Sequence, residues 1–209
     1  MAALPEVYLA RHGETAWTLT GQHTGRTDLP LTARGEQNAL SLCLRLQGAM
    51  FTRVLVSPLT RARRTCELAG FRGQAEVDPD LQEWDYGQYE GRRTADIRQE
   101  RPGWDLFRDG CPGGESVEAV STRADRVMAR LRAVDGDVLV FSHGHFLRVL
   151  AARWLGLPGG DARHFVLSTA ALSILGYEHT RDEPALRLWN DARHVLGEHR
   201  KPMEARGNL

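Results

Sequence analysis

The sequence predicts an α/β fold: a three-layer sandwich in which a mostly parallel central sheet carries helices on both faces. Short apolar runs alternate along the chain with segments whose apolar residues recur at helical spacing, an order typical of parallel sheets. Three of the apolar runs end in polar clusters, at Arg11, Ser57 and Ser142. A chain of 209 residues has the size of one domain, so we expect residues 1–209 to fold around a single core.

The first four expected elements are a strand, a helix, a strand and a helix. Residues 7–10 form an apolar run that stops at the charged cluster 11–15, as a buried strand ending in a functional loop would. Thr32 is a typical N-cap, and the apolar residues that follow it at helical spacing predict a helix of about four turns. Residues 53–57 predict a second strand, ended by a proline and followed by a helical stretch over 60–69.

The middle of the chain is expected to cover the pocket. Residues 78–115 are rich in Gly, Pro, Trp and charged residues and show no long period, which predicts a loop-rich insertion. Ser116 is then the expected N-cap of a helix, because an apolar stripe at helical spacing runs from Val117 to Leu131.

The last third of the chain adds a strand, a helix and a pair of less regular strand patterns. Residues 137–142 predict a third buried strand, and Gly144 opens a helix that ends at Gly156. Residues 171–177 and 185–189 also have strand character and could form a hairpin at the edge of the sheet.

The charge balance excludes some classes of partner. The 27 basic and 27 acidic residues cancel, so no overall field attracts nucleic acid or an anionic membrane. No run of 18 apolar residues predicts a membrane span. We therefore expect no nucleic-acid or membrane partner, and a small ligand bound by local charge. The sequence neither predicts nor excludes a homodimer.

Cysteine usage and the N-terminal residues point to the cytoplasm. Cys43, Cys66 and Cys111 cannot all pair with one another, and their spacing matches no zinc or redox motif. The residues before the first strand lack the basic start and apolar run of a signal peptide.

The polar residues at the strand ends could carry chemistry. The first cluster contains a guanidinium and an imidazole, from Arg11 and His12. Gly13 follows them and lets a ligand or backbone approach closely, so the three residues together suit a phosphate. Alone, this motif is weak, because a single histidine at a strand end is more often structural. His143 could likewise be only a cap or a core hydrogen-bonding group. His143 and His145 could also bind zinc, but no third ligand follows at the usual spacing, so we expect neither a metal nor another cofactor.

An ordered series of motifs resembles the histidine phosphatase superfamily. The motifs are LARHGET at 9–15, TG at 24–25 with LT at 31–32, SPLTRA at 57–62, LQEWDYGQYEG at 81–91, GES at 114–116 and SHGH at 142–145. Two further segments, GQHTG at 21–25 and FRDGC at 107–111, are similar to the sedoheptulose-1,7-bisphosphatase branch of that superfamily.

The resemblance implies five catalytic residues. His12 would be the nucleophile that forms a phosphohistidine. Arg11 and Arg61 would hold phosphate oxygens, and a protonated His143 would add positive charge in the transition state. Glu83 would protonate the leaving oxygen and then deprotonate water. The nearby arginines should lower the pKa of His12, which leaves its lone pair free for attack.

Further substrate contacts are also expected on the basis of the resemblance. They are assigned to Thr18, Thr24, Gly25, Ser57, Tyr86, Arg108, Gly144 and His145. Thr18 stands where many relatives carry Asn, so its hydroxyl would retain that polar contact. Arg92, Arg93 and Arg108 have no assigned partner and could bind a second phosphate, although solvated surface arginines are an equally open interpretation.

These observations favour hydrolysis of a small phosphorylated metabolite, with a sugar phosphate or bisphosphate as the expected substrate. A phosphoglycerate mutase is the alternative within the superfamily. Such mutases carry Lys at the position of Thr94 and a longer insertion with paired arginines, and this chain has neither. A binding module without turnover is a third interpretation, against which the five intact catalytic residues argue.

Overall fold

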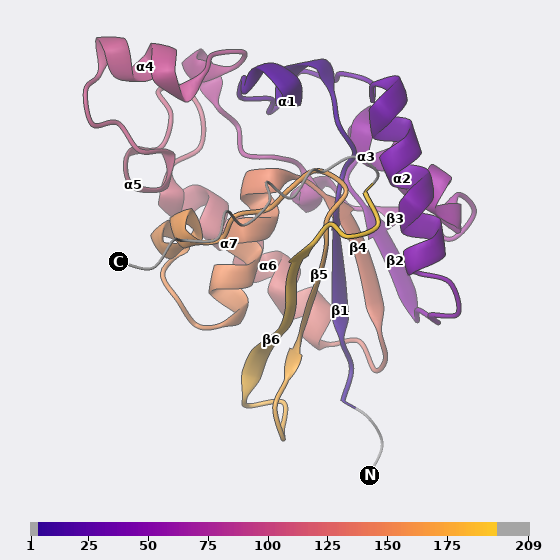
Figure 1. Ribbon diagram of the computed structural model, residues 1–209. Coiled ribbons are helices and arrows are strands. Elements are labelled where there is room, and N and C mark those ends of the chain that lie inside the picture. Colours follow the sequence, from indigo (N-terminus) through magenta and orange to yellow (C-terminus); the bar gives the residue numbers. More distant parts are fainter. Residues whose placement is uncertain (1–3, 196–209) are drawn as a thin grey trace, which may run out of the picture.

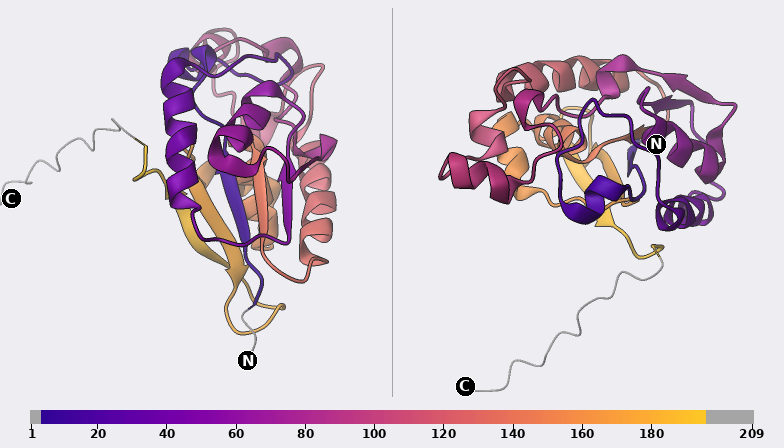
Figure 2. Two further views of the ribbon diagram at one scale, coloured as in Figure 1. Left: turned by 90° about the vertical axis from the view of Figure 1, so that its right-hand side faces the viewer. Right: turned by 90° about the horizontal axis from the view of Figure 1, so that it is seen from above.

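Residues 4–195 are described in the structure, a computed structural model. A six-stranded sheet in the order β3-β2-β4-β1-β5-β6 forms its centre (Figure 1). The strands are β1 (Val7–Arg11), β2 (Arg53–Val56), β3 (Ala75–Val77), β4 (Val138–Ser142), β5 (Leu172–Tyr177) and β6 (Pro184–Asp191). Helices cover both faces of the sheet, as Figure 2 shows, which confirms the expected three-layer α/β fold.

The sheet is parallel where the polar strand ends lie and antiparallel at one side. Strands β3, β2, β4 and β1 pair in parallel, whereas β5 runs antiparallel to β1 and β6 antiparallel to β5. The expected hairpin is confirmed as β5 and β6, but only β6 is at the edge, since β5 also pairs with β1. Strand β3 was not expected; it is three residues long and largely exposed.

The four main helices begin near the expected positions. They are α2 (Ala33–Arg45), α3 (Thr60–Cys66), α6 (Val117–Arg132) and α7 (Gly144–Trp154). The hydroxyl of Thr32 accepts the Gly35 N–H, and that of Ser116 accepts the Ala119 N–H, so both expected N-caps are confirmed. After α3 the chain continues as a π-helical turn, Glu67–Phe71. No helix within residues 4–195 is both long and apolar enough to cross a membrane.

Each face of the sheet has its own apolar core. Helices α6 and α7 cover one face and α2 and α3 the other (Figure 2). Alternate residues of one strand supply the two cores: Leu9 of β1 faces the first and Ala10 the second. In β4, Val140 and Phe141 divide in the same way, and all four of these side chains are fully buried.

The region 78–115 is loop-rich, as expected, but it is packed by its own aromatic side chains. It contains two short helices, α4 (Thr94–Glu100) and α5 (Leu106–Asp109), with 3-10 turns at Pro79–Leu81 and Gly87–Tyr89. Trp84 and Trp104 are buried within it, and the indole N–H of Trp104 donates to the Gly110 carbonyl. Outside this region lie the short helix α1 (Ala16–Thr20), which was not expected, and a 3-10 turn, Gly159–His164.

Candidate active site

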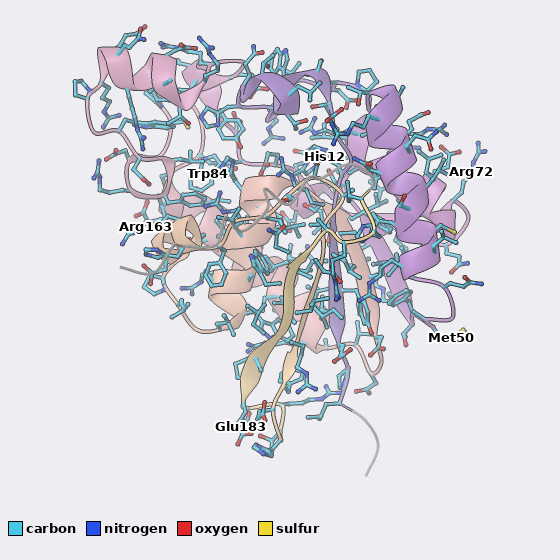
Figure 3. The ribbon with its side chains drawn as sticks, in the orientation of Figure 1. His12, Met50, Arg72, Trp84, Arg163 and Glu183 are labelled. Carbon is cyan, nitrogen blue, oxygen red and sulfur yellow. The ribbon has the colours of Figure 1, made fainter. Side chains whose placement is uncertain are left out.

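Three neighbouring strands deliver the polar residues to one edge of the sheet. Strand β4 lies between β1 and β2, and all three run parallel. The chain continues the pairing one residue past each strand: the His12 N–H donates to Ser142 O, and the Ser57 N–H donates to Phe141 O, both at 3.0 Å. Figure 3 shows His12 just beyond the carboxyl end of β1. His12, His143 and Ser57 are therefore brought together, as the sequence predicts.

His12 has one ring nitrogen fixed and the other free. Its Nδ1 lies 2.7 Å from the Gly13 carbonyl oxygen, and since a carbonyl can only accept, Nδ1 carries the hydrogen. The lone pair is consequently on Nε2. Burial, followed by the charges of Arg61 and Arg11, holds the pKa of His12 well below its usual value, so the ring is neutral near pH 7. A β-carbon at Gly13 would lie 2.4 Å from Gly35 O, so only glycine permits this close approach of the loop after β1 to the first turn of α2.

His143 is held as a neutral imidazole in this structure, while the protonated form that the resemblance implies for the transition state stays a prediction. The Arg61 Nε–H donates to His143 Nδ1 at 3.2 Å, so the hydrogen of the ring is on Nε2, which donates to Ser57 Oγ at 2.7 Å. Burial, together with the charges of Arg61 and His12, keeps the pKa of His143 well below its usual value. A phosphate dianion beside the ring would act in the opposite direction and favour protonation.

Arg61 is fully buried behind the pocket. Besides the contact with His143, it donates to the carbonyls of Thr24, Gly25 and Thr27 at 2.9 to 3.0 Å. Four of its five N–H groups are thus engaged, and it holds the loop after α1 against the strand ends. Its role as a direct phosphate ligand stays a prediction, for which one N–H remains.

Arg11 presents a positive charge with few partners. One terminal nitrogen donates to the Leu167 carbonyl, while Nε is buried without a hydrogen-bond partner among the described residues. Burial lowers the pKa of Arg11, which means that the charged form is poorly solvated. A β-carbon at Gly144 would lie 3.1 Å from the Arg11 guanidinium carbon, so this glycine makes room for the guanidinium. An anion in the pocket would stabilise Arg11 directly.

The Glu83 carboxylate points at the start of helix α7. Its Oε1 accepts the N–H groups of Trp84 at 2.9 Å and Phe146 at 2.8 Å, and its Oε2 accepts the N–H of His145 at 3.0 Å. Glu83 is 5% exposed, so these three bonds fix the carboxylate in one orientation.

Most of the predicted site residues line one pocket of about 240 Å³. Its walls are formed by Arg11, His12, Thr18, Gly21, Gln22, His23, Thr24, Glu83, Tyr86, Thr94, Gly144, His145, Arg148 and Leu167. Eight of these were named from the sequence. A pocket of this volume suits a small ligand.

Tyr86 and His145 form a coupled pair in the pocket wall. The Tyr86 hydroxyl lies 2.5 Å from His145 Nδ1. Burial raises the pKa of Tyr86 and lowers that of His145, so both are neutral and the hydroxyl donates to Nδ1. The remaining ring hydrogen of His145 is on Nε2, where it can donate to a ligand.

Three predicted substrate contacts do not line the pocket, namely Gly25, Ser57 and Arg108. Ser57 is fully buried, and its hydroxyl accepts the hydrogen bond from His143 Nε2. The Gly25 N–H donates to the Glu90 carboxylate, and a β-carbon there would lie 2.5 Å from Trp84 O, so Gly25 serves loop packing. Arg108 is exposed and paired with Asp109 at 2.8 Å, outside the pocket.

The other two arginines considered for a second phosphate are also paired at the surface. Arg92 contacts Glu100 at 2.6 Å and Arg93 contacts Asp96 at 2.8 Å, and neither lines the pocket. For all three arginines, the structure therefore favours the solvated-surface interpretation over phosphate binding.

Sequence reasoning missed several residues of the wall, of which Arg148 and His23 carry the most information. Arg148 lies three residues after His145 on α7, a spacing that places both side chains on one helical face. His23 belongs to a motif noted in the sequence, but it was not assigned to the site. Its ring lies 4.7 Å from that of Tyr86, centroid to centroid.

Among residues 4–195, no group of three or more His, Cys, Asp or Glu side chains is arranged to hold a metal ion. The zinc alternative for His143 and His145 therefore gains no support from the described part of the chain. Hydrogen bonds with Arg61 and Ser57 occupy both ring nitrogens of His143, and one with Tyr86 occupies Nδ1 of His145.

The geometry agrees with comparisons to known proteins. Residues 7–192 match the family model of the histidine phosphatase superfamily (branch 1). The chain belongs to this superfamily. It is 43% identical over 176 residues to an acid phosphatase of Mycobacterium tuberculosis, a match that covers 82% of this chain and 86% of the relative. It is 36% identical to the sedoheptulose 1,7-bisphosphatase of Saccharomyces cerevisiae, with 88% of this chain and 92% of the relative covered.

A solved structure from Mycobacterium tuberculosis shares the fold of this histidine phosphatase. The TM-score is 0.84 at 39% sequence identity, and the match covers 89% of this chain and 97% of the other. The superfamily resemblance inferred from the motifs is thus confirmed. Together with relatives that are phosphatases, it makes this chain a phosphoric monoester hydrolase.

The buried imidazoles predict a loss of stability in acid. Burial lowers the pKa of His23 to about 4, whereas the unfolded chain takes up the proton near pH 6.5. The contribution of the neutral His23 to the unfolding free energy should therefore be fully present above about pH 6.5 and be lost as the pH falls below it. At about pH 5 the loss from His23 alone should be roughly 2 kcal/mol. In urea unfolding at about pH 7.5 and pH 5, His23→Gln should reduce the difference between the two pH values by about that amount.

The exposed His164 provides the control, and His164→Gln should leave the decrease as large as in the unsubstituted protein. An undiminished decrease in His23→Gln would show that the imidazole of His23 is not held neutral by burial.

Proposed function

We propose that this histidine phosphatase hydrolyses the monoester of a small phosphorylated metabolite, a sugar phosphate or bisphosphate, through a phosphohistidine on His12. One observation carries the proposal. The hydrogen bond from His12 Nδ1 to the Gly13 carbonyl leaves Nε2 as a lone-pair nucleophile, in the same pocket as Arg11 and Glu83.

The first step transfers the phosphoryl group to the enzyme. The Nε2 lone pair of His12 forms an N–P bond while the P–O bond to the leaving group breaks, and that electron pair stays on the leaving oxygen. Glu83, protonated for this step, gives its proton to that oxygen, so an alcohol leaves. Arg11 and Arg61 stabilise the charge that develops on the other phosphate oxygens.

The second step returns the enzyme to its initial state. Water attacks phosphorus, and the Glu83 carboxylate takes the proton that water loses. The N–P bond breaks, its electron pair returns to Nε2 of His12, and inorganic phosphate is released. Both steps use Glu83 in opposite protonation states, which requires its carboxylate to stay in place throughout.

His143 would change its charge when substrate binds. It is neutral beside Arg61, but a dianionic phosphate stabilises a proton on the ring. In the bound complex, His143 would then supply the positive charge that the superfamily resemblance assigns to it.

The uncharged part of the wall supports a sugar as the leaving group. This part of the wall offers neutral hydrogen-bond donors and acceptors, which suit the hydroxyl groups of a sugar. They belong to Gln22, Thr24, Thr94, Tyr86 and His145. The relative from Saccharomyces cerevisiae is named for a sugar bisphosphate. The neutral hydroxyl of Thr94 also supports hydrolysis rather than mutase activity, since mutases carry Lys there.

Arg148 is the cation available for a second anionic group. Its Nε and one terminal nitrogen donate to the carbonyls of Ala162 and Arg163, both at 3.1 Å, and its guanidinium lies 4.5 Å over the Phe107 ring. No ion pair within residues 4–195 involves it. Burial lowers the pKa of Arg148 to about 10, so it is charged near pH 7 and incompletely solvated.

A cytoplasmic location and a small-molecule partner complete the proposal. Cys43, Cys66 and Cys111 are unpaired, as expected in a reducing compartment. Burial raises the pKa of both Cys66 and Cys111 to about 12, so neither is a competing nucleophile near pH 7. Association into a homodimer remains compatible with this proposal.

Replacing the nucleophile tests the central step. Enzyme quenched after brief exposure to substrate should carry phosphate in a base-stable, acid-labile bond, and His12→Ala should abolish both this label and turnover. The exposed His164→Ala should retain both. Phosphate recovered on serine or cysteine would contradict the proposal.

The leaving group tests Glu83. Glu83→Gln keeps the shape of the side chain but removes the transferable proton, so hydrolysis of alkyl phosphates should slow by roughly two to four orders of magnitude. Hydrolysis of p-nitrophenyl phosphate should slow much less, because p-nitrophenolate needs little protonation. Equal losses on both substrates would mean that Glu83 only positions the phosphate.

Arg148→Met tests the second anionic group. We expect kcat/KM for sedoheptulose bisphosphate or fructose bisphosphate to exceed that for the matching monophosphates, and Arg148→Met to reduce this preference by roughly tenfold to a hundredfold. Arg108→Met is the matched control and should leave the preference intact. If the Arg108 variant loses the preference and the Arg148 variant keeps it, the second anionic group binds outside the pocket.

A further inference from the structure

Glu83 lies in a segment that side chains hold in place. Residues 82–86 connect two 3-10 turns and have no strand partner. The four consecutive carbonyls of residues 80–83 nevertheless all accept hydrogen bonds from side chains. The donors are Arg123, to Asp80, Gln82 and Glu83, and the Ser142 hydroxyl, to Leu81. The position of the acid is therefore set mainly from outside its own segment.

Arg123, on helix α6, uses its complete donor set in these contacts. Its NH1 donates to Asp80 O at 2.8 Å and Gln82 O at 2.7 Å, and its NH2 donates to Glu83 O at 3.2 Å. The Nε and the second NH2 hydrogen form a two-pronged ion pair with Glu115, at 2.8 and 2.7 Å. A guanidinium has five N–H groups, so none is left for solvent or substrate.

Glu115 holds the residues on the other side of the acid. Its Oε2 accepts the Asp85 N–H at 2.9 Å, and its carbonyl accepts the Trp84 indole N–H at 3.0 Å. Its own N–H donates to Asp85 O at 2.9 Å. Arg123 and Glu115 therefore fix the backbone before and after Glu83, respectively.

The same guanidinium also touches the group at which the acid points. Arg123 lies 4.5 Å over the ring of Phe146, and the Phe146 N–H donates to Glu83 Oε1 at 2.8 Å. One side chain thus contacts both the segment that carries the carboxylate and the helix end that orients it. Arg123 is 8% exposed and does not line the pocket, so it can act only through its neighbours.

We infer that Arg123 and Glu115 are positioning residues for proton transfer by Glu83. The inference rests on the proposed function, in which Glu83 must hand over a proton and later take one at nearly the same place. Because proton transfer requires hydrogen-bond distance, a displacement of the carboxylate weakens acid catalysis more than it weakens phosphate binding. An ion pair that only stabilises the core would affect all substrates equally.

Arg123→Lys is the main test. Lysine keeps the positive charge but has a single nitrogen, so it cannot span Glu115 and three carbonyls. For alkyl phosphates, kcat/KM should fall roughly a hundredfold. For p-nitrophenyl phosphate, the decrease in kcat/KM should be several-fold smaller than for alkyl phosphates. The plot of log kcat/KM against the pKa of the leaving group should therefore become steeper. Arg126→Lys is the matched control: Arg126 is exposed on the same helix and, among residues 4–195, forms an ion pair only with the Asp80 carboxylate. Its plot should match that of the unsubstituted enzyme.

A double variant distinguishes the positioning role of Arg123 from the acid role of Glu83 on which it rests. Without a proton on residue 83, Arg123→Lys should add no further leaving-group dependence to that of Glu83→Gln. If Glu83→Gln itself shows no leaving-group dependence, the acid role fails, and the positioning role fails with it. If Glu83→Gln shows the dependence but Arg123→Lys lowers both substrate classes equally, only the positioning role is overturned.

Glu115→Gln provides the same measurement if Arg123→Lys does not fold. It keeps the size of the side chain and one acceptor oxygen but removes the charge that holds the Arg123 fork. Steepening of the leaving-group plot supports the inference, and an equal loss on alkyl and aryl phosphates overturns it.

Discussion

The site depends on the burial of two guanidinium groups, Arg11 and Arg61, beside two imidazoles. Positive charge in a space that excludes water keeps His12 and His143 neutral, because a further proton would be both unsolvated and repelled. A neutral His12 retains the lone pair that attack on phosphorus requires. In the proposed mechanism the same unsolvated charge attracts a phosphate dianion, so one physical cause would both prepare the nucleophile and recruit the substrate.

The parallel part of the sheet makes this arrangement possible. Strands β2, β4 and β1 end side by side, and backbone hydrogen bonds continue one residue past β1 and β2, so the groups that follow the strands meet at one edge of the sheet. Glu83 differs, because it comes from the covering region and must be brought to the site by other means. Three backbone N–H donors hold the Glu83 carboxylate, and Arg123 and Glu115 hold the segment that carries it. These contacts fix the position of Glu83 as the sheet fixes that of His12.

The parts that the sequence predicted were those with local causes. The caps of α2 and α6 follow from Thr32 and Ser116, and the buried strands follow from continuous apolar runs. Strand β3 was missed because three largely exposed residues carry no pattern; pairing with β2 makes them a strand. The five residues proposed to be catalytic were named from motifs, whereas the neutral form of His143 in the structure depends on which atom of Arg61 reaches the ring.

The arginines show why the residues available to an anion were hard to identify from the sequence. Arg92, Arg93 and Arg108 were considered because nothing in the sequence assigned them a partner, yet each meets a carboxylate at the surface. Within residues 4–195, Arg11, Arg61 and Arg148 have backbone carbonyls or an imidazole as hydrogen-bond partners and no ion pair. A carbonyl dipole orients a guanidinium without neutralising it, whereas a carboxylate cancels its charge. In a chain with no net charge, the choice of carbonyl over carboxylate partners is therefore what leaves positive charge for an anionic substrate in this pocket.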